Sequence, residues 1–204
     1  MAARVESLTS VLTDADSMSA DLNPSDPELL LQALNGREEQ FTLLYQRRQG
    51  GVYRFALQMS GSATLAEDIT QETFIALLQS GHRYDSARGS VAAFLYGIAR
   101  NLVMRRLERD RRYQPEQEDC TADGDLLEDL TRTESIELVR QAVLNLPPVY
   151  REVVVLCDLQ ETTYEDAASA LDCPIGTVRS RLSRARGMLA RKLCGAANIV
   201  RSNG

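Results

Sequence analysis

The amino-acid sequence predicts an all-α fold of two small helical domains joined by an acidic flexible linker, the second domain carrying a helix-turn-helix. Three observations lead to this prediction. Apolar residues recur at three- and four-residue spacing over much of the chain, which is the period of an amphipathic helix. An acidic stretch with few large apolar residues, at 113–133, separates two such segments. A short turn containing Pro174 separates the last two expected helices, because proline cannot continue a helix but suits the first turn of the next.

Changes in composition along the chain set the expected domain boundaries. The N-terminal residues are polar and come before the first helical pattern, so they are expected to be disordered. The expected segments are a disordered extension at 1–25, a first domain at 26–112, the linker at 113–133, a second domain at 134–195 and a tail at 196–204.

The first domain is expected to contain helices at Pro27–Leu34, Glu38–Met59, Ala63–Leu78 and Val91–Arg112. Gly50 and Gly51 lower the helical propensity of the second helix and mark a site for a kink. In the third helix the residues expected to face inward are Leu65, Ile69, Phe74, Leu77 and Leu78. The apolar residues of the fourth helix are Phe94, Leu95, Ile98, Leu102 and Leu107, and Ser80–Ser90 before it reads as a loop.

The second domain is expected to begin with a helix at Glu134–Leu144, which ends before Pro147 and Pro148. The following stretch, Val149–Leu159, is ambiguous. Its run of three valines favours a strand, whereas Val149, Val153, Leu156 and Cys157 also fit a buried helix. We predict a helix, because no partner strand is visible nearby.

Two short helices and a sharp turn are expected between Thr163 and Leu193. Thr163 can cap the first helix, with Asp166 as its capping-box partner. The second helix carries basic residues on the faces that its apolar residues leave open. This is the form in which a helix-turn-helix enters a DNA major groove. The alternative is a surface helical hairpin with solvated arginines, but no acidic residue after Asp172 balances the charge.

The N-terminal half of this second helix is expected to point toward base edges. Arg179 and Arg181 are therefore candidates for base or nearby phosphate contacts, followed by Ser180 and Arg184 on the exposed side. Arg186 and Lys192, further along, are expected to meet phosphates or solvent.

Composition excludes several classes of protein. The 204 residues are 44% hydrophobic and 25% charged, and no apolar run approaches the ~20 residues of a membrane span. The N-terminus lacks the apolar core of a signal peptide. The 4 cysteines and the single His82 have no metal-ligand spacing, which argues against zinc and disulfides and suits a reducing cytoplasm. There is no P-loop, no GxSxG motif and no nucleophile–base pair, so no catalytic residue, metal or cofactor is expected.

A net charge of −6 looks unfavourable for a DNA-binding protein, but the charges are segregated along the sequence. One basic block precedes the acidic stretch and consists of Arg100, Arg105, Arg106, Arg109, Arg111 and Arg112. The last helix forms another basic block. The acidic stretch between them is expected to keep the two basic modules apart, or to occupy them weakly when DNA is absent.

Three segments resemble the extracytoplasmic-function (ECF) group of bacterial sigma factors, the promoter-specificity subunits of RNA polymerase. Ala66–Leu78 resembles the polymerase-clamp-binding helix of sigma region 2, and Tyr84–Leu102 resembles the segment that melts and reads the −10 element. Leu146–Leu189 resembles region 4, which reads the −35 element. The motifs occur in the family's order and span about Pro27–Leu193. The resemblance implies a cytoplasmic, non-enzymatic sigma factor.

The resemblance also implies partners and site residues. The expected partners are core RNA polymerase, through its β′ clamp and β flap, promoter DNA and an anti-sigma factor. The implied polymerase-binding residues are Asp68, Gln71 and Glu72. The implied −10 residues are Tyr84, Arg88, Phe94, Tyr96, Arg100, Asn101 and Arg105. The implied −35 residues are Thr177, Arg179, Ser180, Arg181, Ser183 and Arg184.

The chain departs from the family pattern in three places. Phe94 stands where the family usually has Trp, Val91 where an aromatic residue is common, and Ser183 where a bulkier side chain often lies. These differences concern base preference rather than the class of function. The alternative function is a stand-alone helix-turn-helix regulator, although the first domain shows no ligand-pocket signature and has its own basic block.

Overall fold

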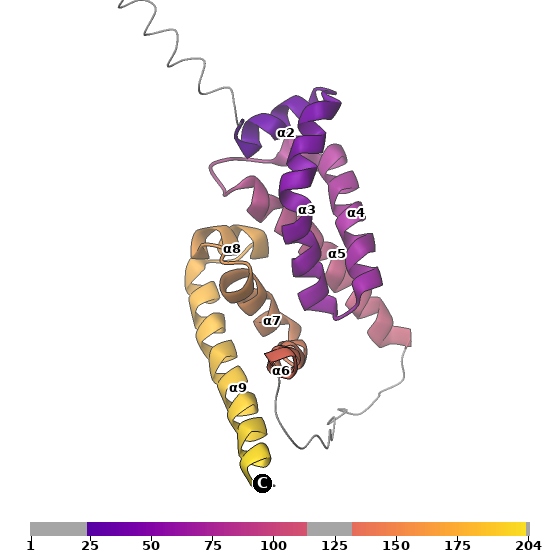
Figure 1. Ribbon diagram of the computed structural model, residues 1–204. Helices are drawn as coiled ribbons and strands as arrows, with labels where there is room; N and C mark the ends of the chain where they lie inside the picture. The colour runs from indigo at the N-terminus through magenta and orange to yellow at the C-terminus, as the bar shows by residue number, and fades with distance from the viewer. Residues whose placement is uncertain (1–23, 114–131, 203–204) are drawn as a thin grey trace, which may run out of the picture. The chain divides into compact units, whose positions relative to one another are not determined.

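The computed structural model describes residues 24–113 and 132–202, and over these residues it consists of helices and turns without a β-strand (Figure 1). This confirms the prediction of an all-α fold. The elements are α2 (Asp26–Leu34), α3 (Glu38–Ser60), α4 (Ala63–Ser80), the 3-10 turn η2 (Gly81–Arg83), α5 (Val91–Tyr113), α6 (Arg132–Leu144), α7 (Pro148–Val154), the π-helical turn η3 (Val155–Leu159), α8 (Tyr164–Leu171) and α9 (Ile175–Ser202). The predicted acidic linker lies largely outside the described residues.

Two compact units divide the chain, one from Met1 to Leu44 and one from Tyr45 to Gly204. In the first, Ser25 precedes α2, and its backbone N–H donates to the Glu28 carboxylate at 2.8 Å. This is half of a capping box and fixes the start of the helix. The second unit contains helices from both sides of the acidic stretch, and α5 contacts α8 within it.

Helix α3 runs through Gly50 and Gly51 as one element, so the glycines do not interrupt the helix. The position of Tyr96 on α5 gives a reason for glycine at position 51. A Cβ at Gly51 would come within 2.9 Å of the Tyr96 hydroxyl on α5. The missing side chain therefore leaves room for the Tyr96 hydroxyl against α3.

Helix α4 buries a stripe that includes Ile69, Phe74 and Leu77. The prediction that Leu78 faces inward is wrong, because its side chain is 46% exposed. Adjacent helical residues point about 100° apart, so Leu77 and Leu78 cannot share the core. Ser62 caps the helix, its Oγ accepting from the Leu65 N–H at 3.3 Å.

The buried face of α5 is narrower than its apolar residues suggested. Of the five predicted apolar positions only Leu95 is fully buried, and the core face continues through Val91, Ala99 and Val103. These four residues recur every fourth position, which defines one face of the helix. Phe94 and Ile98 flank it and are half-buried.

The ambiguous stretch after Pro148 is helical, as predicted, and consists of α7 and η3. Val153, Val154, Val155 and Leu156 are all buried, so packing overrides the strand propensity of the valines. Val149 was expected to be buried but is 42% exposed.

Arg151 on α7 ties three backbone segments together. Its guanidinium donates to the carbonyl oxygens of Met59 at the end of α3, of Leu144, and of Leu146 at 3.1 Å. Burial lowers the pKa of this guanidinium, yet Arg151 stays charged because its ordinary pKa is so high. A charged donor on helix-end carbonyls stabilises groups that the helices themselves leave unpaired.

Arg151→Leu is expected to lower the free energy of unfolding by about 2–3 kcal/mol, because several carbonyl oxygens lose a charged donor. Urea unfolding followed by circular dichroism measures this change. Arg140→Leu is the control, because Arg140 reaches the Gly61 carbonyl only at 3.5 Å. Equal stability losses for the two variants would contradict the role given to Arg151.

The helix-turn-helix forms as predicted from α8 and α9. Thr163 caps α8, its Oγ accepting from the Asp166 N–H at 3.1 Å. The reciprocal half of the expected capping box is not formed, because the Asp166 carboxylate binds elsewhere. Asp172 ends α8 in the left-handed conformation, with φ 48°. The helix α9 continues past Leu193 to Ser202.

Candidate nucleic-acid and protein interfaces

The exposed face of α4 carries the predicted protein-binding residues. Asp68 and Gln71 are exposed, and no described side chain forms an ion pair with Asp68. Glu72 differs, because its carboxylate accepts from Arg106 of α5 at 2.5 Å. The side chains of Asp68 and Gln71 are thus open to a binding protein, whereas the Glu72 carboxylate is already paired with Arg106.

An open groove runs beside this face, between α3 and α4. Its volume is about 540 Å³. Its lining is aromatic and polar and consists of Tyr45, Gln46, Gln49, Gly50, Tyr53, Glu67, Thr70 and Gln71. Gln71 therefore belongs to both the acidic face and the groove, so one partner segment can contact both.

Of the −10 candidates, Tyr84 contacts Phe94, and Phe94, Asn101 and Arg105 share one face of α5. The rings of Tyr84 and Phe94 are 5.8 Å apart and meet edge to face. Asn101 and Arg105 are exposed on α5, seven and eleven positions after Phe94, which returns them to nearly the same face of the helix. Arg105 Nε also donates to the Asn101 carbonyl at 3.2 Å. We call this set, Tyr84, Phe94, Asn101 and Arg105, the aromatic stripe.

The other −10 candidates contact further residues, although Arg100 also donates to the Asn101 Oδ1 at 3.4 Å. Tyr96 packs its ring 5.5 Å from that of Phe55, and burial raises the pKa of its hydroxyl. Arg100 donates to Glu152 of α7 at 2.7 Å. Arg88 lies 3.4 Å from the Asp172 carboxylate. Tyr96, Arg88 and Arg100 are therefore already engaged by other side chains of the protein.

The −35 candidates on α9 divide in a similar way. Ser180, Ser183 and Arg184 are exposed, and Ser180 Oγ donates to the carbonyl of half-buried Thr177 at 3.1 Å. Thr177, Ser180 and Arg184 are three and four positions apart and share one face. We call these three residues the recognition face.

The two remaining arginines flank the recognition face. The Arg179 guanidinium lies 5.8 Å from the centre of the Tyr164 ring, a cation–π contact with α8. Arg181 donates to Glu152 at 3.3 Å and is only partly exposed. Arg186, expected to meet phosphate or solvent, instead binds Asp158 with two hydrogen bonds of 2.5 and 3.1 Å, and this pairing raises its pKa.

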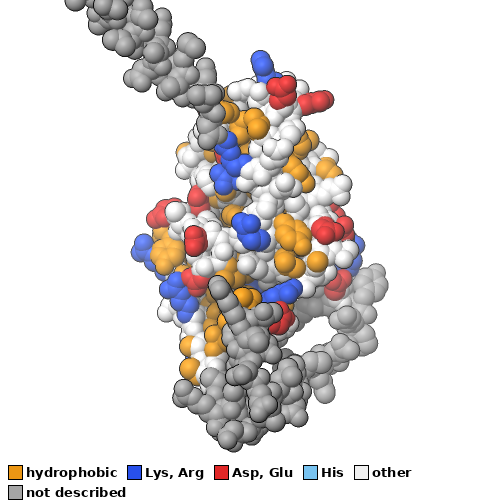
Figure 2. All heavy atoms as spheres, in the orientation of Figure 1, with side chains coloured by type: hydrophobic (Ala, Val, Ile, Leu, Met, Phe, Trp, Pro, Cys, Tyr) orange, Lys and Arg blue, Asp and Glu red, His pale blue; other side chains and the backbone are white. Residues whose placement is uncertain are grey.

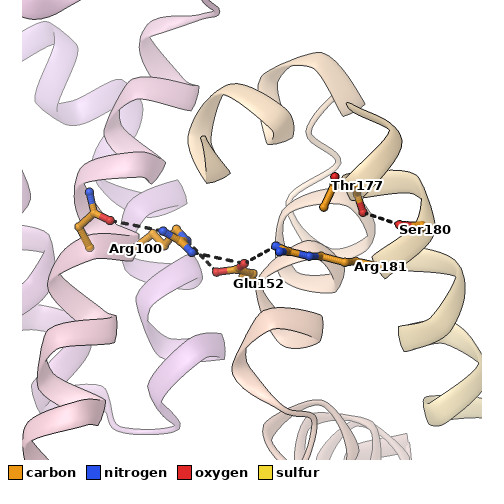
Figure 3. Close-up of polar contacts among 6 residues, drawn as sticks. Arg100, Glu152, Thr177, Ser180 and Arg181 are labelled. Carbon is orange, nitrogen blue, oxygen red and sulfur yellow. Dashed lines mark hydrogen bonds and ion pairs between the residues drawn. The ribbon is translucent and has the colours of Figure 1, made fainter. Parts of the chain in front are cut away.

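Glu152 was not singled out from the sequence. Its side chain is fully buried, and it accepts from Arg100 on one side and Arg181 on the other (Figure 3). A buried carboxylate needs such partners, because an unpaired charge is costly in the interior. The only signal in the sequence is a glutamate directly before a run of three valines.

Asp166 was also missed as a contact residue. Its carboxylate accepts from the Ser90 N–H and the Ser90 hydroxyl, both at 2.9 Å. Ser90 in turn caps α5, its Oγ accepting from the Ala93 N–H at 3.1 Å. An acid at a helix N-terminus is favourable because unpaired N–H groups and the positive end of the helix dipole meet there.

The predicted segregation of charge along the sequence does not give one uniformly basic face. On the face seen in Figure 2, basic and acidic side chains are interspersed among apolar ones. Several arginines of the described residues are paired with carboxylates, including Arg100, Arg106, Arg181 and Arg186. Acids of the folded helices therefore already pair with arginines of both basic blocks.

Two of the described cysteines, Cys157 and Cys173, fit packing roles, whereas Cys194 is exposed. Cys157 and Cys173 are half-buried free thiols, and burial raises the pKa of Cys157 to about 11. Burial raises the pKa of Cys173 as well. Both remain protonated thiols near neutral pH, the less reactive form.

Two family models match the chain in the order in which the helices occur. Residues 44–113, which include most of α3, all of α4 and all of α5, match the model for sigma-70 region 2. Residues 136–189, which run from α6 into α9, match the model for sigma-70 region 4. The chain belongs to the ECF family of sigma-70 factors.

Relatives of this sigma factor agree with that assignment. It is 36% identical over 152 residues to the ECF RNA polymerase sigma factor SigE of Mycolicibacterium smegmatis, a match covering 72% of this chain and 58% of that protein. It is 30% identical over 190 residues to the probable RNA polymerase sigma-C factor of Mycobacterium bovis, covering 89% of this chain and 94% of the relative.

A solved structure resembles the sigma factor over most of its length. The sigma factor RpoE of Bartonella quintana, in complex with the anti-sigma factor NepR, superposes with a TM-score of 0.57. The two chains are 27% identical, and the match covers 76% of this chain and 95% of that one. No helix of the described part of this sigma factor is long and apolar enough to cross a membrane.

Proposed function

We propose that this sigma factor binds core RNA polymerase and directs promoter-specific initiation by reading the −10 element with α5 and the −35 element with α9. The observation that carries the proposal is the presence of both sigma regions, in order, on one chain that also exposes an acidic protein-facing helix. A promoter-specificity subunit needs a polymerase surface and two DNA surfaces, and the described helices offer candidates for all three.

The α4 face supports the polymerase-binding part. Asp68 is exposed, so it can pair with an arginine or lysine of the β′ clamp, and Gln71 can hydrogen-bond beside it. Glu72 contributes by holding Arg106, which fixes α5 against α4. Region 4 is expected to contact the β flap, and Val149 and Ile136 are exposed apolar side chains available there.

The aromatic stripe supports promoter melting. An unstacked base costs a few kcal/mol, which aromatic stacking and hydrogen bonds on the protein must offset. Tyr84 and Phe94 supply rings at one place, and the exposed amide of Asn101 supplies a donor and an acceptor on the same face. Arg105 adds a positive charge for the adjoining phosphate.

The recognition face supports reading of the −35 element. Arg184 is exposed and can donate two hydrogen bonds to a guanine, while Ser180 can bond to a base or a phosphate. Arg179 is exposed beside Tyr164 and is suited to a contact with the phosphate backbone of the DNA. Ser183 is short and exposed, so it leaves room for bases in the DNA major groove.

The proposal extends to location and regulation. The protein works in the cytoplasm with the polymerase, and it accelerates initiation by binding and positioning DNA without catalysing a reaction itself. The structural relative from Bartonella quintana is bound to an anti-sigma factor. Regulation of this chain by an anti-sigma factor is proposed on that likeness.

The test is co-purification with core polymerase. The full chain is mixed with core enzyme and separated by gel filtration, and the complex is then tested for binding to promoter DNA. We expect the chain to elute with core enzyme and to give it promoter-specific binding. A chain that ignores core enzyme but binds duplex DNA tightly alone would instead be a stand-alone regulator.

Tyr84→Ala and Asn101→Ala are each expected to slow open-complex formation, because each removes a group that holds the unstacked −10 base. The loss is about 1–3 kcal/mol for a stacking residue, or roughly 5- to 150-fold. Permanganate footprinting of the holoenzyme on its promoter measures the melted bases. The control is binding to a −35 duplex, which both variants should retain, and a wild-type footprint from both would contradict the assignment.

A further inference from the structure

A small pocket with a basic lining lies between α3 and α5, and its volume is about 200 Å³. We call it the arginine pocket, because α3 contributes three arginines to its wall. The lining consists of Arg47, Arg48, Gly51, Val52 and Arg54 of α3, Ala92, Leu95 and Tyr96 of α5, and Gln160 directly after η3. Positions 47, 51 and 54 are four and three residues apart and share one face of α3.

The positive charge of the arginine pocket is not balanced by its own lining. Its described lining residues include three arginines but neither Asp nor Glu. Other arginines pair with carboxylates, as Arg106 does with Glu72. Arg54 is exposed and forms no ion pair with any described residue. Guanidinium groups held near one another repel, so an anion bound between them lowers their free energy.

A hydroxyl group adds an uncharged donor to the arginine pocket. Tyr96 donates to Gln160 Oε1 at 3.5 Å, which is longer than the about 2.5–3.0 Å of an ordinary O–H···O bond. Burial raises the pKa of Tyr96, against the opposing charges of Arg54 and Arg48, so the group stays a protonated donor near neutral pH. Gln160 is held in place, because its Nε2 donates to Gln58 Oε1 at 2.9 Å.

These donors match the chemistry of a phosphate group. Guanidinium groups bind phosphate oxygens through paired, charge-assisted hydrogen bonds, which are roughly twice as strong as neutral ones. The volume is several times the ~30 Å³ that one water molecule takes up in the liquid. It is also smaller than the roughly 300–1,000 Å³ of pockets that enclose a drug-sized ligand. The arginine pocket therefore suits a phosphate or diphosphate group rather than a whole nucleotide.

We infer that the arginine pocket binds the phosphate groups of a small anion, such as free pyrophosphate or the diphosphate end of a nucleotide. The inference goes beyond promoter recognition, because Arg47, Arg48 and Arg54 are not among the residues assigned to polymerase or DNA. The guanidinium groups of α3 hold the phosphate oxygens, and the Tyr96 hydroxyl donates to one of them.

Calorimetric titration of the full-length chain with pyrophosphate, at constant ionic strength, tests the inference. The wild type should bind one equivalent. Arg54→Gln should weaken binding about tenfold or more, because a charged donor is lost. Tyr96→Phe should weaken it about two- to tenfold, because it removes the hydroxyl and keeps the ring that packs on Phe55. Arg109→Gln is the matched control, since Arg109 is exposed on α5 outside the pocket lining.

The thermal midpoint gives a second measure of binding. A ligand at ten times its Kd should raise the midpoint of a protein of this size by about 3–6 °C. Pyrophosphate should produce this rise in the wild type and in Arg109→Gln, and a smaller rise in Arg54→Gln at the same concentration. Sodium chloride of equal ionic strength should not produce it. Circular dichroism of each variant before heating checks that the helices have formed.

A further arm separates a small anion from the DNA backbone as the source of the phosphate. A mixed-sequence DNA duplex is titrated with the wild type and with Arg54→Gln. Equal duplex affinities, together with weaker pyrophosphate binding by Arg54→Gln, would support the inference. Weaker duplex binding by Arg54→Gln, with no pyrophosphate binding by the wild type, would assign the arginines to DNA and overturn it. Equal losses of pyrophosphate affinity in Arg54→Gln and Arg109→Gln would also overturn it, because net charge alone would then explain binding.

Discussion

Asp68→Arg is expected to reduce the affinity for core polymerase by about 100-fold or more, because the substitution places like charges against each other across the interface, which costs several kcal/mol. The thermal midpoint should stay within error, because Asp68 is exposed and no described side chain is ion-paired with it. A pull-down with immobilised core enzyme measures the affinity.

The control for this variant is Glu165→Arg, which makes the same change of charge at an exposed position on α8. It should bind core polymerase like the wild type. Normal binding by Asp68→Arg would remove the α4 face from the polymerase interface. Equal losses in both variants would show that net charge, rather than this face, governs binding.

The second large effect is expected at the recognition face. Arg184→Ala should cost roughly 1–3 kcal/mol on the preferred −35 sequence and relax the preference at one base pair. Arg184 is favoured over Arg181 because Glu152 already engages Arg181, whereas Arg184 is exposed. The measurement is binding of the holoenzyme to a panel of −35 variants at several salt concentrations.

Arg191→Ala serves as the comparison, since Arg191 is exposed further along α9. It should weaken binding to all sequences alike, or not at all, and lower the salt dependence by about one counterion. The same uniform loss for Arg184→Ala would make α9 a backbone clamp and place the base specificity elsewhere.

The elements were largely predictable because their signals are local. Helical periodicity and the turn residues located the helices, and Thr163 and Pro174 marked the helix-turn-helix. Errors arose where two apolar neighbours competed for one face. In α4, Leu77 is buried and Leu78 is exposed. In α5, the buried face begins at Val91, so Phe94 lies at the edge of that face and is half-buried.

The candidate sites were less predictable, because sequence spacing defines a helix face but not what packs on it. The recognition face follows from three- and four-residue spacing, and the α5 members of the aromatic stripe follow from the helical period, but the contact of Tyr84 with Phe94 does not, because Tyr84 lies outside the helix. The partners of Arg100, Arg106 and Arg181 do not, since they come from helices distant in sequence. Asp166 illustrates the point, because a local capping box was predicted and the carboxylate bonded instead to Ser90, 76 positions away.

Run-off transcription tests the central claim most directly. Purified core polymerase is supplied with a library of promoter fragments, with and without the full chain. A sigma factor should produce discrete transcripts that depend on the chain and share sequence at the −10 and −35 positions. If core polymerase with the chain added yields the same transcripts as core polymerase alone, while the chain binds these fragments unaided, the protein is not a sigma factor.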